Sequence, residues 1–95
     1  MRTIAPLSVR IEDWLHTLIK QPNTVWAADI SPDNQILASG SSDGKIKLWD
    51  LNTGHLLRIF SGHSQLVAAL VFSSDGQTLV SGSHDGTFKI WRVPS

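Results

Sequence analysis

Short apolar segments alternate with turn-forming residues along most of this chain of 95 residues. Each segment holds four to six residues, and most are bounded by Asp-Gly, Pro-Asp or Asn-Thr-Gly sequences. Such a pattern predicts antiparallel strands joined by tight turns, so we expect an all-β protein. The predicted strands are residues 25–30, 36–40, 46–50, 56–60, 67–72, 78–81 and 87–92.

The N-terminal segment supports two interpretations. Helical spacing is shared by Ile11, Trp14, Leu15, Leu18 and Ile19, with Ser8 available as a cap. A shift of 42 positions instead aligns residues 14–18 with the predicted strand 56–60, which favours a strand. We therefore expect a loosely held arm over residues 1–13 and an eighth strand over residues 14–19.

The second half of the chain repeats the first at an offset of 42 residues. Residues 23–50 and 65–92 are identical at 13 of 28 aligned positions, which is too many for chance. The turn pairs Asp43-Gly44 and Asp85-Gly86 are among the shared residues. The chain therefore consists of two copies of one structural unit.

This period, with four short strands in each unit, resembles the WD-repeat family of β-propellers. The pairs Gly62-His63 and Trp49-Asp50 match the two dipeptides typical of the family. Two positions depart from the pattern, because Lys20-Gln21 replaces the first Gly-His and Trp91-Arg92 replaces the second Trp-Asp.

The resemblance implies one propeller blade in each repeat. We expect blade one, with four strands, over residues 20–61. Blade two, over residues 62–95, has only three strands of its own. Residues 14–19 would then form the outer strand that closes a blade.

In WD repeats four residues form a buried hydrogen-bonded chain, and the resemblance places these roles on His63, Asp85, Ser81 and Trp91. We expect Asp85 to accept from one imidazole nitrogen, and the Ser81 hydroxyl to join the other nitrogen to the indole N–H. The first copy keeps Ser39, Asp43 and Trp49. Because Gln21 stands in place of its histidine, we expect blade one to be the looser blade.

The resemblance also implies a binding face at the strand ends that surround the mouth of a propeller. Its candidate residues are Thr24, Trp26, Ser42, Leu66, Ala68 and His84. A tryptophan at position 26 contrasts with alanine at position 68 of the other copy. We favour core filling or a subunit contact for Trp26, with an exposed binding anchor as the alternative.

Composition narrows the classes of function. Eight basic residues balance eight acidic ones, so we expect neither nucleic acid nor a membrane surface as a partner. Cysteine is absent, which fits a cytoplasmic protein without disulfides or thiolate metal sites. No apolar run is long enough for a membrane-spanning helix.

The chemistry-bearing residues do not predict an enzyme. Ser81, His63 and Asp85 are expected to lie inside a packed blade, where a hydrolase triad would have no substrate access. His16, His55 and His84 stand singly, without a second ligand at metal spacing. We expect no catalytic residues, no metal and no cofactor.

We expect a non-catalytic scaffold that binds an unidentified protein or peptide. Two blades cannot cover their own outer faces, which predicts a closed ring of identical chains with the N-terminal strand exchanged between subunits. Three chains would give six blades and four would give eight, and we favour four. The expected contact residues are Trp14, Leu15, Leu18, Phe88 and Ile90.

Two alternatives remain open. The protein could be a propeller lectin or a small-molecule binder, with Trp26 as the sugar platform. It could also be the last two blades of a longer propeller.

Overall fold

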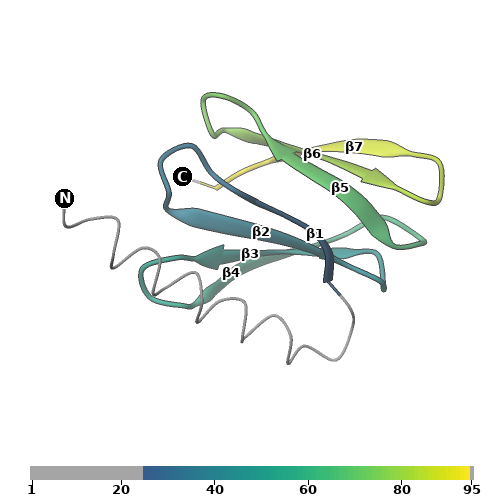
Figure 1. Cartoon of the computed structure of the whole chain (residues 1–95), viewed down its shortest axis with the longest axis horizontal. Coiled ribbons are helices and arrows are strands. Elements are labelled where there is room, and N and C mark those ends of the chain that lie inside the picture. The colour runs from purple at the N-terminus through teal and green to yellow at the C-terminus, as the bar shows by residue number, and fades with distance from the viewer. Residues whose placement is uncertain (1–24, 95) are drawn as a thin grey trace.

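The computed structural model describes residues 25–94, which form seven strands in two antiparallel sheets (Figure 1). The first sheet has the order β1 (Val25–Ile30), β2 (Ile36–Ser41), β3 (Lys45–Asp50), β4 (Leu56–Ser61). The second has the order β5 (Val67–Phe72), β6 (Thr78–Ser83), β7 (Phe88–Arg92). These seven strands confirm the predicted all-β class. The predicted arm and the strand 14–19 lie outside the described residues.

The hairpin turns show why the strands end where they do. Asn34 and Gly76 occupy the same position in the two repeats, and both have positive φ, 60° and 73°. Beside them, Asp33 accepts the backbone N–H of Gln35, and Asp75 accepts that of Gln77, each at 3.0 Å. Side chains that bond their own backbone favour turns over continued strands.

The two sheets pack face to face, and the main core lies between them. Ala38, Ile46 and Leu48 of the first sheet contact residues of the second sheet that include Val67 and Leu70. All of these side chains are buried. Apolar side chains on one face of each sheet are thereby removed from water, which is the main driving force for folding.

Backbones at this boundary approach closely. A Cβ at Gly40 would lie 2.6 Å from Cγ1 of Val67, so only glycine fits there. Two specific contacts also join the sheets. The carboxylate of Asp29 in β1 accepts the backbone N–H of Phe72 in β5 at 2.9 Å. The rings of Phe60 and Trp91 stack with their centroids 4.6 Å apart.

Within residues 25–94 there is no helix with the length and apolar character that a membrane span requires.

Gly44 lies in the β2–β3 turn and packs closely against the backbone of the second repeat. An added Cβ at Gly44 would lie 2.3 Å from the carbonyl oxygen of His63 and 2.9 Å from that of Gln65. Gly54 has a similar φ, but a Cβ there would have no neighbour within 4 Å. The two glycines therefore form a matched pair, because they share backbone strain and differ in packing.

We expect Gly44→Ala to destabilise the protein more than Gly54→Ala. Both changes place alanine at positive φ, which costs about 1–2 kcal/mol. The collision with the second repeat at Gly44 adds about 1–3 kcal/mol. Urea unfolding followed by tryptophan fluorescence measures both losses. Equal losses would contradict the close contact between the Gly44 turn and His63.

Candidate functional site

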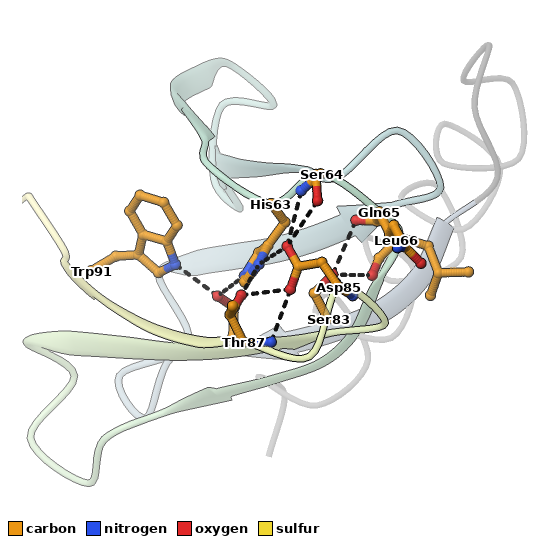
Figure 2. A network of polar contacts seen from close by, with 9 residues as sticks. His63, Ser64, Gln65, Leu66, Ser83, Asp85, Thr87 and Trp91 are labelled. Carbon is orange, nitrogen blue, oxygen red and sulfur yellow. Dashed lines mark hydrogen bonds and ion pairs between the residues drawn. The ribbon is translucent and has the colours of Figure 1, made fainter.

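A chain of hydrogen bonds crosses the second sheet (Figure 2). The Trp91 indole N–H donates to the Ser81 hydroxyl oxygen at 2.8 Å. The same hydroxyl lies 2.7 Å from Nε2 of His63, and Nδ1 of His63 lies 3.3 Å from the Asp85 carboxylate. The structure thus brings together the four residues assigned from the family pattern.

Pairing each donor with an acceptor predicts where the protons of this network lie. The Ser81 oxygen accepts from the indole, so its own hydrogen is available to Nε2 of His63. Nδ1 of His63 then carries the ring proton, which faces both Asp85 and the Thr87 hydroxyl at 3.2 Å. His63 and Ser81 are buried, and their polar atoms are paired.

Asp85 connects two segments of the second repeat. Its carboxylate accepts the backbone N–H groups of Ser64 and Thr87, each at 2.9 Å, and the Thr87 hydroxyl at 2.5 Å. The Thr87 hydroxyl first, and the Ser64 N–H second, hold the pKa of Asp85 well below its ordinary value, whereas partial burial opposes this shift. Asp85 is therefore an ionised acceptor that fixes the segment before β5 to the β6–β7 turn.

Thr87 and Ser64 were missed by the sequence analysis. Ser64 contributes its backbone N–H, which carries no side-chain signal. Thr87 corresponds to Lys45 in the first copy, so comparison of the two repeats gave no indication of its role. Its position two residues after Asp85 was the available signal, since hydroxyls often bond a turn aspartate at that spacing.

The corresponding site in the first repeat is arranged differently. The Trp49 indole donates to the Ser39 hydroxyl at 3.2 Å, which is longer than the equivalent bond in the second repeat. Asp43 accepts from the Ser41 hydroxyl and from the backbone N–H of Lys45. Gln21 lies outside the described residues.

Three segments meet at one end of the two sheets, and we call this surface the loop end. It consists of the turns 41–44 and 83–86 and the connecting segment 62–66. The Leu66 carbonyl accepts the Ser83 hydroxyl at 2.8 Å and the His84 N–H at 3.2 Å. Gly44 contacts the backbone of the same segment from blade one. The network around His63 therefore holds the second-repeat part of the loop end in place.

The described candidates for the binding face lie at or beside this end. A bulge in β1 between Val25 and Ala27 contains Trp26, and a bulge in β5 between Val67 and Ala69 contains Ala68. Bulges re-aim side chains and interrupt pairing. Ser42 and His84 are exposed in the neighbouring turns, and Leu66 is half-buried. Thr24 lies outside the described residues.

Trp26 is not part of the core. Its side chain is 56% exposed, so the core-filling interpretation is wrong within this chain. The sequence pattern was ambiguous because an apolar residue in a predicted strand is usually buried. Half-buried and exposed residues alternate from Val25 to Ala28, and Trp26 is on the exposed side, where a bulge interrupts pairing with β2.

The serine of this network is closed to solvent. The Ser81 hydroxyl is 0% exposed, so a substrate carbonyl cannot reach it. Among residues 25–94, no three His, Asp or Glu side chains are grouped as a metal site.

A cavity of about 650 Å³ opens at the opposite end of the sheets. It lies between the turns 31–35 and 73–77, with Asp50, Leu57 and Arg58 on its wall. The Ser31 hydroxyl lowers the pKa of Asp33, and the Ser73 hydroxyl lowers that of Asp75. These carboxylates stabilise their own turns, which accounts for their presence at the cavity.

We expect Ser81→Ala to destabilise the protein more than Ser39→Ala, although both serines are buried at the same repeat position. Ser81→Ala breaks two hydrogen bonds and leaves His63 and Trp91 without them, at about 1–3 kcal/mol for each buried group left unpaired. Ser39→Ala breaks one longer bond. Denaturant midpoints of the two variants measure the difference, and indistinguishable midpoints would contradict it.

Comparison with known proteins gives a family and several relatives. The sequence model of the family described as WD domain, G-beta repeat (WD40), matches residues 13–50 and 54–92. Mitochondrial division protein 1 of Candida glabrata is 38% identical over 55 residues, which cover 58% of this chain and 8% of that protein. Eukaryotic translation initiation factor 3 subunit I of Neurospora crassa is 50% identical over 34 residues, which cover 36% of this chain and 10% of that protein.

Solved structures share the arrangement of strands. The computationally designed Ika4 protein superimposes with a TM-score of 0.68 and 42% identity, over 75% of this chain and 42% of that one. U3-55K superimposes with a TM-score of 0.74 and 27% identity, over 79% of this chain and 25% of that one. The chain spans about a tenth of the length of the two curated relatives. The two family matches cover most of the sequence, and the chain belongs to the WD40 repeat family.

Proposed function

We propose that this chain is a non-catalytic scaffold that binds another protein, or a peptide segment of one, at the loop end. The observation that carries the proposal is that Trp26 is exposed beside the loop end. The buried network around His63 holds the second-repeat part of that surface in place. Tryptophan is enriched among the residues that dominate binding energy at protein interfaces. Membership of the WD40 family and a relative that is by name a subunit of an initiation factor support the same class of function.

Rigidity of the loop end would favour binding. Asp85 and the Ser83 hydroxyl bond the segment 62–66 at two separate points. A surface that is already ordered loses less conformational entropy when a partner binds. The polar network therefore contributes to recognition through the shape of the surface, without contacting the partner.

The second candidate function is binding of a sugar or a small molecule. Trp26 favours it, because an exposed indole can also stack on the apolar face of a sugar ring. The two functions differ in the size of the surface they need, so they are separable by experiment.

The complete scaffold is proposed to be a closed ring of identical chains. Within the described residues β7 is the edge strand of its sheet, so its outer backbone groups are available for pairing. Residues 14–19 of a neighbouring chain would supply the missing outer strand. We prefer four chains to three. The hydrogen bond from Trp49 to Ser39 is longer than its counterpart in the second repeat, so blade one is held less tightly and would tolerate a wider ring.

We expect peptides selected by display on the purified assembly to depend on Trp26. Trp26→Ala should weaken their binding about tenfold or more, because an interface tryptophan is a frequent energetic anchor. Leu57→Ala, which changes another exposed apolar side chain near the opposite end, is the matched control. A glycan array screened with both variants tests the second candidate. Peptide binding that is equally strong in both variants would contradict the assignment of the loop end.

We expect light scattering to give a particle of about 42 kDa, four times the chain mass of 10.4 kDa. Deletion of residues 1–19 should remove the closing strand and yield aggregates or unfolded chains. A folded particle with the mass of one chain would contradict the ring. A mass three times that of the chain would support the six-bladed form instead.

A further inference from the structure

The cavity at the end opposite the loop end is built by both repeats. The β1–β2 turn, the end of β3 and the start of β4 line it from blade one, and the β5–β6 turn and residues 93–94 line it from blade two. These segments lie together at one end of the two sheets (Figure 1). The volume of about 650 Å³ lies within the range of about 300–1,000 Å³ that is typical of ligand sites. The space is therefore large enough for a long side chain of another molecule and part of its backbone.

Hydrogen bonds and packing hold the walls of this cavity in place. A carbonyl of the β1–β2 turn accepts the N–H of Leu51, and one of the β5–β6 turn accepts that of Val93, each at 2.9 Å. A Cβ at Gly76 would lie 3.4 Å from Cδ of Pro32, so the two turns touch. The walls are thus ordered before a ligand arrives, which lowers the entropy cost of binding.

Three carboxylates line the cavity, and each keeps one oxygen for a ligand. Oδ1 of Asp33, of Asp50 and of Asp75 accepts two hydrogen bonds from its own turn in each case. Within residues 25–94, Oδ2 of these aspartates has no hydrogen-bond partner. The turns therefore explain why the aspartates are present, and they leave half of each carboxylate available.

The cavity has an excess of negative charge. Among residues 25–94, Arg58 is the only basic side chain on its wall, and it forms no ion pair with the other residues of this range. Arg92 acts on Asp75 from outside the cavity, because it alternates with Trp91 and lies on the other face of β7. Three carboxylates outnumber two guanidinium groups even when Arg92 is counted.

Apolar side chains supply much of the remaining wall. Ile36 and Val93 come from the core between the blades, and Pro32, Leu57 and Pro94 also line the cavity. An alkyl chain that ends in a positive charge matches such a surface, since its methylene groups pack on apolar side chains while its head reaches the carboxylates. The excess negative charge disfavours an anionic ligand.

The available oxygens favour lysine over arginine. A guanidinium group binds a carboxylate best through two parallel hydrogen bonds, one to each oxygen. Oδ1 is already occupied in all three aspartates, so each offers Oδ2 alone. A lysine ammonium suits such a site, because it is a compact charge whose three donors can point to different carboxylates.

We infer that this cavity binds a lysine side chain of a partner protein. The ammonium group is placed among Asp33, Asp50 and Asp75, and its alkyl chain packs against Ile36 and Val93. The cavity lies within a single chain and away from the loop end, so the inference depends on neither the ring nor Trp26. It gives the proposed scaffold a second attachment point, with a defined chemistry, at its opposite end.

Nuclear magnetic resonance of the full chain tests both the ligand and its place. The probes are short blocked peptides of sequence Gly-Ser-Ala-Xaa-Ala-Ser-Gly, in which Xaa is lysine, norleucine, glutamate or arginine. The lysine peptide should shift the backbone amides of Gln35, Gln77 and Val93, and leave those of Ser42 and His84 at the loop end unchanged. The norleucine peptide keeps the alkyl chain and lacks the charge, so it should bind about tenfold more weakly.

Each other outcome would contradict a particular part of the inference. Equal binding of the lysine and norleucine peptides, binding of the glutamate peptide, or the absence of shifts around the cavity would overturn it. Tighter binding of the arginine peptide would overturn the assignment of lysine. Binding of n-butylamine that is as tight as that of the lysine peptide would indicate a free amine as the ligand, and would overturn the docking of a partner protein.

Two substitutions change the charge of the cavity in opposite directions. Asp50→Asn should weaken binding of the lysine peptide about threefold, because it removes a charge and keeps a carbonyl oxygen for the turn. Arg58→Gln should strengthen binding about twofold, because it removes a repelling charge. Titrations of the same amides measure both dissociation constants, and circular dichroism checks that the strands persist. Arg58 bonds no turn of the described residues, so its variant decides the question even if Asp50→Asn unfolds. Unchanged or weaker binding in Arg58→Gln would overturn the inference.

Discussion

The two sheets of this protein depend on each other, because each removes one apolar face from water by packing against the other. The largest core cluster among the described residues contains Ala38, Ile46 and Leu48 from one sheet and Val67 and Leu70 from the other. The close approach at Gly40 and the bond from Asp29 to Phe72 depend on the same contact. The loop end also depends on it, because Gly44 meets the second repeat there. A site built on both blades can only be as rigid as the boundary between them.

Much of this arrangement could be predicted from the sequence because its determinants are local or repeated. Asp-Gly turns and short apolar runs determine where strands begin and end, and all seven predicted strands within residues 25–94 are present. The positions of His63, Ser81, Asp85 and Trp91 followed from the spacing of a known repeat. Their hydrogen bonds could be anticipated because a buried imidazole, hydroxyl and indole must each find a partner.

The remaining features depend on differences between the two copies or on the backbone, and neither is visible in a repeat pattern. Thr87 and Asp29 are replaced by Lys45 and Val71 in the other copy. Because neither residue is shared by the two copies, comparing the copies gave no reason to assign them a role. Ser64 acts through its N–H. Trp26 is exposed at a bulge of β1, and its residue type alone does not distinguish an exposed position from a buried one. The contacts that the repeat pattern did not predict are therefore made by residues that differ between the two copies or by the backbone.

The stacking of Phe60 on Trp91 has a consequence for the order of folding. Phe60 belongs to the outer strand of the first sheet, whereas Trp91 belongs to the last strand of the second. The first sheet can form its hairpins early, because its strands are neighbours in sequence. Phe60 is covered only once β7 is in place, so an intermediate with a formed first sheet still exposes an aromatic side chain on its outer strand. An aromatic side chain exposed in this way promotes the aggregation of partly folded chains.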